Sequence, residues 1–511
     1  MLNRDQTLAA LVEEIDAVVI GGGINGAVAV AALSARGINV VLAEANDFAS
    51  MTSQESSNMI WGGIKYLQDY EFRLVWSLCR SRNELLAKYP NRVKQIPFFA
   101  VIGPTSPFNR VLGFLGSTLY WFFGRLKTQG PKIFSNSGIS KINRFIRLAS
   151  TKGAIQYSDA ILLDNDARFV YEFIKTAGSH NAKVLNYFEI IKATPRTNGW
   201  DLTALDKISG AEVTFKAKVL INAAGPYAKI LTDQFEIPTG HEIVISKGVH
   251  LIVPHIETNN KVLAFFDDAG RLFYVLPMHD RTVIGTTDTP AQSAGVTVTD
   301  EDRDFLLAQA NRCLNLDRDL VRADIIAERC GVRPLVVNKS ANLEKVDWVS
   351  LSRKHEVELN KELNSISIFG GKLTDCINVG HEVTELVIKL GIQPTKNLNW
   401  VGESDPDIPN ELITQLANFH SDAAELGIQL WRRHGATAFQ IARSFNDDPL
   451  NSKLIFEGLY FTVGELKHII KTEHVVNSDD LLRRRTPLAL LRSEAELAQN
   501  LHLQELLKLI K

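Results

Sequence analysis

The stretch from Asp16 to Glu44 constrains the fold most, because it reads as a strand, a glycine-rich turn, a helix and a second strand. The apolar run at 17–20 is typical of a buried parallel strand, and the alanine-rich run at 27–36 is typical of a helix. Between them the chain has the spacing G-x-G-x-x-G. In this order the elements predict a Rossmann-type βαβ unit that binds a dinucleotide.

Each residue of the motif has its own physical role. Gly21 permits the tight turn, Gly23 lets the backbone approach a pyrophosphate, and Gly26 lets the helix pack closely on the strand. Asn25 lies in the same turn, and the helix that starts there points unpaired N–H groups at the phosphates. Glu44 ends the second strand, 18 residues after Gly26, where a carboxylate can accept hydrogen bonds from ribose hydroxyls.

Composition sets the broad class. A chain of 511 residues is expected to form two or three domains. Its net charge of −2 gives no global basic field, so nucleic acid is not an expected partner. The four cysteines form no Cys-x-x-Cys pair, and no cluster of His, Cys and carboxylates has metal-ligand spacing. We therefore expect reduced cysteines, a cytoplasmic location and no metal.

One segment is unusually apolar. Residues 108–127 are rich in Leu, Phe, Tyr and Trp, with no charge between Val111 and Phe123 and basic residues on both sides. A stretch this short cannot span a bilayer, and the start of the chain lacks the apolar core of a signal peptide. The pattern fits a helix that lies in a membrane interface, and it equally fits a core or subunit-interface helix.

The rest of the chain alternates between sheet-like and helical patterns. Residues 190–218 read as an antiparallel meander, and 219–227 read as a strand that returns to the dinucleotide fold. Residues 235–325 read as a largely antiparallel sheet, and 346–368 as a hairpin. From 399 onward the patterns are helical, with candidate helices at 410–426, 436–444, 463–472, 479–483 and 491–509.

Several motifs together resemble the FAD-dependent glycerol-3-phosphate dehydrogenase family over nearly the whole chain. They are the opening βαβ unit, the run TSQESSNMIWGGIKYLQDYEFRLV at 52–75, the YSD and DAR pieces at 157–168, KGVH at 247–250, GTTD at 285–288, GVRPL at 331–335, GGKLT at 370–374 and the C-terminal stretch at 464–490. The resemblance implies FAD as cofactor.

We therefore expect an α/β (α+β overall) protein with a discontinuous Rossmann-type FAD-binding domain, an antiparallel-sheet substrate cap and a C-terminal helical domain. The expected ranges are 1–95, 150–234 and 330–398 for the FAD-binding domain, 96–149 for the apolar and aromatic insertion, 235–329 for the cap and 399–511 for the helical domain.

The resemblance also implies the reaction. It is the oxidation of sn-glycerol 3-phosphate to dihydroxyacetone phosphate by hydride transfer to flavin N5, with quinone as electron acceptor and oxygen as the second candidate. Relatives pass electrons to membrane quinone, so a peripheral contact with the inner face of the cytoplasmic membrane is expected. We also expect a homodimer.

The chemistry requires a cation for the phosphate and a base for the hydroxyl proton. By motif, His250 is the expected base, with Arg333 and Lys372 as further catalytic residues. Lys65 and Tyr66 join Arg333 and Lys372 in substrate binding. The expected cofactor-binding residues are Gly21, Gly23, Asn25, Gly26, Glu44, Thr52, Ser53, Ser57, Trp61, Gly62, Gly63, Val184, Ala223, Gly225, Gly371, Lys372, Leu373 and Thr374.

The chain departs from the family pattern in the first of these segments. Asn58 stands where the family has lysine, Trp61 where it has histidine, and Lys65 where it has arginine; Asp375 replaces a threonine further on. Lys65 keeps the charge without the bidentate fork of arginine. These departures motivate an alternative, a flavin enzyme of the same fold that acts on another small anionic hydroxy or amino acid. A flavin-binding scaffold or sensor is the third hypothesis.

The arginines outside these motifs have simpler interpretations. Arg168 is expected to pair with a carboxylate rather than meet substrate. Arg82 is interpreted as part of a solvated or interface face, and the run Arg483 to Arg485 as a solvated helix end, with a membrane or subunit contact as the alternative.

Overall fold

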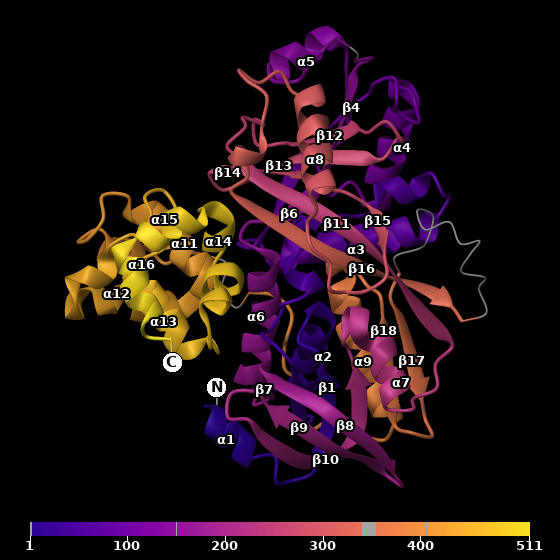
Figure 1. Cartoon of the computed structure of the whole chain (residues 1–511), viewed down its shortest axis with the longest axis vertical. Helices are drawn as coiled ribbons and strands as arrows, with labels where there is room; N and C mark the ends of the chain where they lie inside the picture. The colour runs from indigo at the N-terminus through magenta and orange to yellow at the C-terminus, as the bar shows by residue number, and fades with distance from the viewer. Residues whose placement is uncertain (1–2, 150, 340–353, 404–406, 511) are drawn as a thin grey trace.

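The computed structural model describes residues 3–149, 151–339, 354–403 and 407–510. It contains two β-sheets, one above the other in Figure 1, and a cluster of C-terminal helices beside them. The predicted fold class is confirmed by this arrangement. Of the expected hairpin at 346–368, residues 346–353 lie outside the described residues.

The first sheet has eight strands in the order β17-β18-β10-β1-β2-β7, with β8 and β9 continuing from β10 as an antiparallel meander. Strand β1 pairs in parallel with β2 and β10, and β10 pairs in parallel with β18. The strands are β1 (Ile15–Ile20), β2 (Val40–Ala43), β7 (Lys183–Leu185), β8 (Phe188–Arg196), β9 (Gly199–Asp206), β10 (Ala211–Asn222), β17 (Glu356–Asn360) and β18 (Ser365–Phe369).

Helices α2 (Ile24–Ala35), α6 (Asp166–Ser179) and α9 (Cys376–Lys389) pack together in one hydrophobic core with this sheet. Nearly every residue of α2 is buried, and its alanines let the neighbouring helices approach closely. The other face of the sheet packs against the meander. The two short helices near it are α1 (Arg4–Ala9) and α7 (Ala228–Gln234).

The second sheet has ten strands in the order β15-β11-β14-β13-β12-β4-β6-β3, with β16 paired to β11 and β5 paired to β6. All its pairs are antiparallel except β12 with β4. The strands are β3 (Met59–Ile60), β4 (Val93–Val101), β5 (Lys132–Phe134), β6 (Ala154–Leu162), β11 (His241–Pro254), β12 (Val262–Phe266), β13 (Leu272–Met278), β14 (Arg281–Gly285), β15 (Thr289–Ala291) and β16 (Ala327–Asn338).

This membership differs from the expected domain ranges. Strands β3 and β6 were expected in the FAD-binding domain. The expected boundary at 95/96 divides β4, and the one at 329/330 divides β16. All four strands belong to the second sheet, which we call the cap sheet. The reason is that β11 pairs with β16 along twelve residues, and β4 pairs with β6 along nine. The helices of this half are α3 (Phe72–Lys88), α4 (Arg110–Phe123), α5 (Asn136–Ile142) and α8 (Asp300–Cys313).

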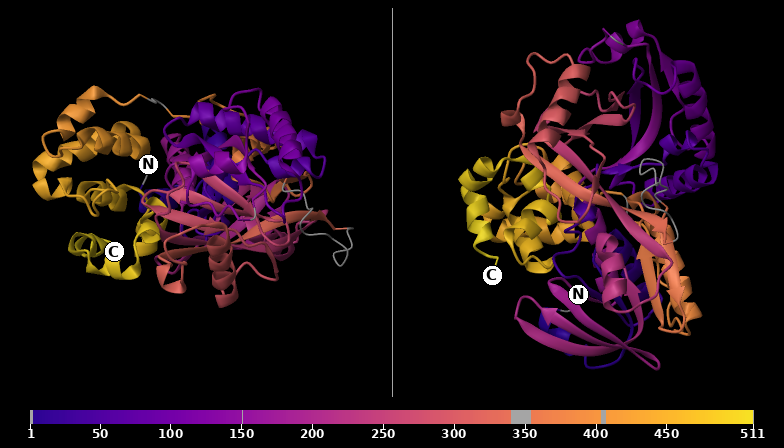
Figure 2. Two further views of the ribbon diagram at one scale, coloured as in Figure 1. Left: turned by 90° about the horizontal axis from the view of Figure 1, so that it is seen from above. Right: turned by 45° about the vertical axis from the view of Figure 1, so that its right-hand side comes forward.

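The C-terminal helices lie beside the two sheets, in yellow and orange in Figure 2. They are α10 (Asn410–Leu416), α11 (Ala423–His434), α12 (Ala438–Asp447), α13 (Val463–Thr472), α14 (Leu488–Leu491), α15 (Glu494–Gln499) and α16 (Leu501–Leu507). The first three of them have a hydrophobic core of their own, whereas α13, α14 and α16 share a core with strands of the second sheet. The expected helix at 410–426 is two helices, with a break between 416 and 423. None of the helices in the described ranges has the length and apolarity needed to cross a membrane.

The arginine interpretations have mixed outcomes. The structural interpretation of Arg168 is confirmed, because it is buried and donates to Glu473. The solvated interpretation of Arg82 is wrong: its side chain is buried and donates to Asp159 at 2.8 Å. Residues 483–485 are not a solvated helix end either, because Arg484 and Arg485 are buried and bind carboxylates of the same chain.

Candidate active site

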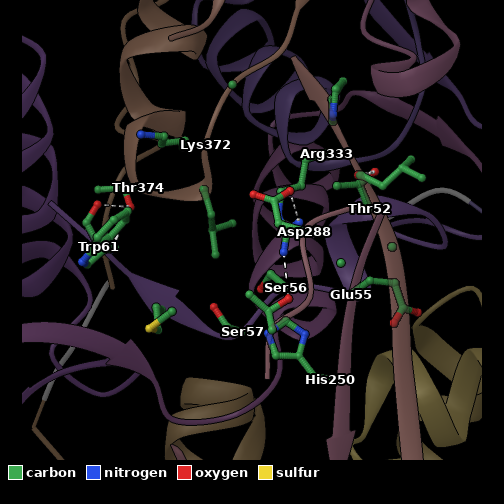
Figure 3. A pocket seen from close by; sticks show the side chains of 18 of the residues that line it. Thr52, Glu55, Ser56, Ser57, Trp61, His250, Asp288, Arg333, Lys372 and Thr374 are labelled. Carbon is green, nitrogen blue, oxygen red and sulfur yellow. Dashed lines mark hydrogen bonds and ion pairs between the residues drawn. The ribbon is translucent and has the colours of Figure 1, made fainter. Parts of the chain in front are cut away.

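Two adjoining cavities lie at the carboxyl ends of β1, β2 and β10 and beneath the cap sheet. We call the first, of about 450 Å³, the dinucleotide cavity, and the second, of about 310 Å³, the reaction cavity. They lie side by side, because five residues line both of them: Ile24, Thr52, Ser53, Pro334 and Gly371. Figure 3 shows ten labelled side chains that line the reaction cavity.

The dinucleotide cavity is built on the glycine turn. Gly21 has φ +104°, a conformation that side chains rarely adopt, and a Cβ on Gly26 would lie 1.8 Å from the carbonyl oxygen of Gly21. Glu44 follows β2 and accepts hydrogen bonds from the Gly22 N–H at 2.5 Å and the Asn46 N–H at 2.8 Å. Burial raises the pKa of this carboxyl above its usual range.

Most of the expected cofactor-binding residues line one of the two cavities. They are Gly21, Gly23, Asn25, Glu44, Thr52, Ser53, Ser57, Trp61, Ala223, Gly225, Gly371, Lys372, Leu373 and Thr374.

Four others line neither cavity. Gly26 serves the helix–strand packing. Gly62 is required by packing, because a Cβ there would lie 2.2 Å from the Tyr120 hydroxyl. Gly63 is favoured by its backbone conformation, with φ +81° at the start of a short 3₁₀ turn. Val184 is buried in the core between β2 and the helices. The structure does not place Gly62, Gly63 or Val184 at the cavity surface.

His250, on β11, points into the reaction cavity. Its side chain is buried, and neither ring nitrogen has a hydrogen-bond partner among the described residues. Burial lowers the pKa of the imidazole to about 3, and the positive charges of Arg329 and Arg333 add to this effect. The ring is therefore neutral at neutral pH and free to accept a proton.

Arg333, on β16, lies across the floor of the same cavity. Its Nη2 donates to the Thr286 hydroxyl at 2.9 Å, and its Nη1 lies 3.2 Å from a carboxylate oxygen of Asp288. The guanidinium passes directly over Gly248, where a Cβ would lie 2.1 Å from Nη2. Only glycine at that position leaves room for the arginine.

The remaining expected substrate residues come from two other segments. Lys65 and Tyr66 lie on the 3₁₀ turn at 64–67, and Lys372 lies in the turn that precedes α9. The ammonium of Lys372 lies 3.9 Å from the centre of the Tyr66 ring, in a cation–π contact. The cavity thus brings together all the residues that the sequence assigned to catalysis and substrate binding.

Two residues that depart from the family pattern, Trp61 and Asp375, form hydrogen bonds or ion pairs within the chain. Trp61 is fixed through its backbone, because its N–H donates to the Thr374 hydroxyl at 3.0 Å and its carbonyl accepts from that hydroxyl at 3.1 Å. Asp375 forms an ion pair with His355 at 3.0 Å. Burial alone would lower the pKa of His355, but the bonds to Asp375 and Glu382 outweigh it and raise the pKa to about 9.

Sequence reasoning missed several charged residues of this region. Glu55, Arg271 and Asp288 line the reaction cavity, although Asp288 lies in the GTTD motif that marked the segment. Arg329 is almost fully buried and donates to the side-chain oxygen of Asn58 at 3.1 Å. It therefore brings a positive charge from β16 to the place where the family pattern has a lysine.

The fold and the two cavities define the class of protein. The family model DAO, FAD dependent oxidoreductase, matches residues 16–350. The chain therefore belongs to the FAD-dependent oxidoreductases, and FAD is its cofactor.

Relatives narrow this class. The chain is 30% identical to the glycerol-3-phosphate dehydrogenase of Pseudomonas aeruginosa over 500 residues, which cover 96% of this chain and 94% of that protein. It is 28% identical to the aerobic glycerol-3-phosphate dehydrogenase of Escherichia coli, over 93% of this chain and 94% of that one. Within the FAD-dependent oxidoreductases, the chain thus belongs to the glycerol-3-phosphate dehydrogenase family.

A solved structure shows the same fold. The glycerol-3-phosphate dehydrogenase of Bacillus halodurans, determined in complex with FAD, superimposes with a TM-score of 0.73 and 23% identity, covering 98% of this chain and 91% of that chain.

The residues present fit FAD. The glycines at 21–23 have no side chains of their own to hold a pyrophosphate away from the backbone. Glu44 retains acceptor capacity for ribose hydroxyls beyond its two backbone bonds. The side-chain amide of Asn25, at the start of α2, donates a hydrogen bond to the carbonyl oxygen of Gly370 at 2.9 Å. This bond connects the glycine turn to the turn before α9. The two turns that would flank the cofactor are thereby joined.

Proposed function

We propose that the protein oxidises sn-glycerol 3-phosphate to dihydroxyacetone phosphate and passes the electrons to quinone. The observation that carries this proposal is the convergence of several cations and one neutral, buried histidine on a cavity that adjoins the dinucleotide cavity. Bound FAD supplies the acceptor for the hydride, at N5 of its ring. The chain's own residues bind the anion, orient the carbon and remove the proton.

The phosphate would be held by Arg333, Lys372 and Lys65. Arg333 has a fixed direction because Thr286 and Asp288 hold its guanidinium. Two lysines and an arginine suit a dianion, and charge-assisted hydrogen bonds to phosphate are the stronger kind. Tyr66 adds a neutral donor beside Lys372.

His250 would accept the hydroxyl proton of the substrate. A neutral imidazole without a hydrogen-bond partner in the described structure is available for that proton. Arg333, one of the two arginines that lower its pKa, lines the cavity that the anionic substrate would enter. The negative charge of the substrate opposes that of Arg333, so substrate binding raises the proton affinity of the base.

Quinone as acceptor requires contact with a membrane, and we propose that α4 makes it. The exposed residues Val111, Leu112, Leu115, Leu119 and Phe122 fall on one face of α4, within an arc of about 100°. The surrounding range 102–153 contains eight exposed cations and no Asp or Glu; the cations are Arg110, Arg125, Lys127, Lys132, Lys141, Arg144, Arg147 and Lys152.

This combination of an apolar stripe and unopposed positive charge suits the anionic inner face of a cytoplasmic membrane. It supports a peripheral location and disfavours a core role for α4. We further propose that the protein is a homodimer. Oxygen is the alternative to quinone as electron acceptor.

A second candidate function is oxidation of another small anionic hydroxy or amino acid. The departures at Trp61 and Lys65 favour it, because both residues line the reaction cavity where the substrate would lie. Asn58 lies behind that wall and accepts a hydrogen bond from Arg329.

One experiment separates these functions. The purified FAD-loaded protein is mixed anaerobically with sn-glycerol 3-phosphate, glycerol, lactate, glycine or proline, and the visible flavin absorbance is followed. Bleaching by sn-glycerol 3-phosphate alone supports the first function. Bleaching by a carboxylate substrate alone supports the second, and an oxidised flavin with every compound contradicts both.

A further inference from the structure

The segment 45–57, which we call the cavity loop, lines both cavities. The loop contacts the phosphate-binding turn through its backbone and one side chain: the Ala49 N–H donates to the Gly22 carbonyl at 3.0 Å, and the Ser53 hydroxyl accepts from the Ile24 N–H at 3.0 Å. The loop residues at the cavity surfaces are Ala45, Asn46, Ala49, Ser50, Met51, Thr52, Ser53, Glu55, Ser56 and Ser57. The position of this loop therefore sets the shape of the space that FAD occupies.

Two arginines of the C-terminal helical domain hold the start of the loop. Arg485 donates from both Nη atoms to the two carboxylate oxygens of Asp47, each at 2.8 Å, and Arg484 donates from Nε to the same carboxylate at 2.6 Å. Asp47 is fully buried, so these guanidinium groups and Asn186 replace its water. A buried carboxylate with this many donors fixes the local backbone firmly.

A third arginine holds the middle of the loop. Arg483 donates to the backbone carbonyl of Gln54 at 2.6 Å and forms an ion pair with Glu55 at 3.2 Å. Glu55 in turn accepts from the Cys330 N–H of β16 at 3.0 Å. Three consecutive arginines thus attach one loop to a domain more than 400 residues further along the chain.

We propose that Arg483, Arg484 and Arg485 are positioning residues through which the C-terminal helical domain keeps the cavity loop in its FAD-binding shape. None of the three lines either cavity, so they act on the cofactor through the loop alone. A loop without these contacts has to be ordered when FAD binds, and that ordering costs conformational entropy. FAD affinity is then a property of the contact between the two domains.

The test measures FAD affinity of the apoprotein, without substrate. Arg483→Gln removes the contacts to Gln54 and Glu55 and leaves Asp47 with both its arginines. Arg492→Gln is the matched control, because Arg492 is an arginine of the same domain with similar side-chain exposure, 8% against 12% for Arg483, that pairs with Asp280 at 2.9 Å, away from the loop. The dissociation constant is obtained from the fluorescence of free FAD during titration.

We expect Arg483→Gln to raise the dissociation constant for FAD at least about tenfold, equivalent to about 1.4 kcal/mol, while Arg492→Gln leaves it unchanged. Thermal unfolding of both apoproteins shows that they are folded. A folded Arg483→Gln variant with wild-type FAD affinity would overturn the proposal, as would an equal loss of affinity in Arg492→Gln.

Hydrogen exchange gives a second readout. In the apoprotein of Arg483→Gln, we expect faster amide exchange at 45–57 and unchanged exchange in β1 and α2; unchanged exchange in the loop contradicts the proposal. Neither measurement involves a substrate, so failure here leaves the proposed reaction untouched. A variant with normal FAD binding but no reaction would instead count against the proposed function.

Discussion

His250 on β11 lies directly opposite Arg329 on β16, and Ser246 lies opposite Arg333 in the same ladder. Residues at an even spacing along a strand share a face, so this one pairing directs both His250 and Arg333 to the same side of the cap sheet. The guanidinium of Arg333 lies over Gly248, two positions from His250, which is about 7 Å along a strand. This span is comparable to the length of the three-carbon phosphate ester that we propose as substrate.

Replacing the proposed base tests this geometry first. We expect His250→Asn to lower kcat/KM for sn-glycerol 3-phosphate about 10²- to 10⁴-fold, because a positioned general base contributes that much. The rate of anaerobic flavin reduction measures it. His241→Asn is the control, since His241 lies on the same strand, is held by Glu358 and lines neither cavity. Wild-type reduction by the His250 variant would exclude it as the base.

The pH dependence should follow from the charges beside that histidine. Burial, with Arg329 and Arg333, places the pKa of His250 at about 3, so the acid limb of kcat/KM should lie far below the usual histidine range near about 6.5. Arg329→Met removes one repelling charge, which raises the pKa and moves the limb to higher pH. The profile is measured on protein shown to be folded. A limb that stays in place would show that Arg329 does not act on His250.

Gly248→Ala should disable Arg333 without removing its charge. The added Cβ would lie 2.1 Å from Nη2, and the flexible end of the arginine can move away at little cost to the fold. We expect a KM for sn-glycerol 3-phosphate about tenfold to a hundredfold higher, the range expected for losing one charged hydrogen-bond partner. Gly295→Ala, with open space around it, is the control. Unchanged KM in Gly248→Ala would place the phosphate elsewhere.

The features predicted correctly from sequence depend on short spacings. The βαβ unit, from β1 through α2 to β2, follows from three glycines and an acid within one stretch. Motif resemblance led to His250, Arg333 and Lys372, which line one cavity, and their roles there stay predictions.

The features that sequence reasoning missed depend on partners far along the chain. Arg329 contacts Asn58 across 271 positions, and Arg485 contacts Asp47 across 438. An isolated arginine run looks the same whether it meets water or a buried carboxylate, so the burial of 483–485 had no local signal. The cap boundaries were missed for the same reason, since the β11–β16 ladder joins segments some 90 residues apart.

Acid should weaken the attachment of the C-terminal domain. Burial alone would raise the pKa of Glu473, but Arg168 and Lys175 outweigh it and lower the pKa to about 2. A glutamate in the unfolded chain has a pKa of about 4.3. The ion pair of Glu473 with Arg168 therefore contributes its full stabilisation above that pH and loses it as the pH falls toward about 2. Denaturant unfolding at a series of pH values measures the loss. Glu473→Gln should lower the free energy of unfolding by about 3–5 kcal/mol at neutral pH and should reduce its dependence on pH in the acid range. If that pH dependence is unchanged in the variant, other carboxylates cause the acid sensitivity.

The apolar face of α4 gives the remaining prediction, on membrane contact. Leu115 and Phe122 are 59% and 67% exposed, and burying two such side chains in a bilayer interface contributes about 3 kcal/mol or more. We expect the protein to sediment with phosphatidylglycerol vesicles, more weakly at high salt and weakly with phosphatidylcholine alone, because both the apolar stripe and the cations contribute.

The double variant Leu115→Asp, Phe122→Asp should lower the partition coefficient between vesicles and water at least about a hundredfold. Ile208→Asp with Leu501→Asp, two exposed apolar residues elsewhere, should bind like the wild type. Equal loss in both variants would mean that the effect is general charge repulsion, and vesicle binding that survives the α4 changes would place the membrane contact on another surface.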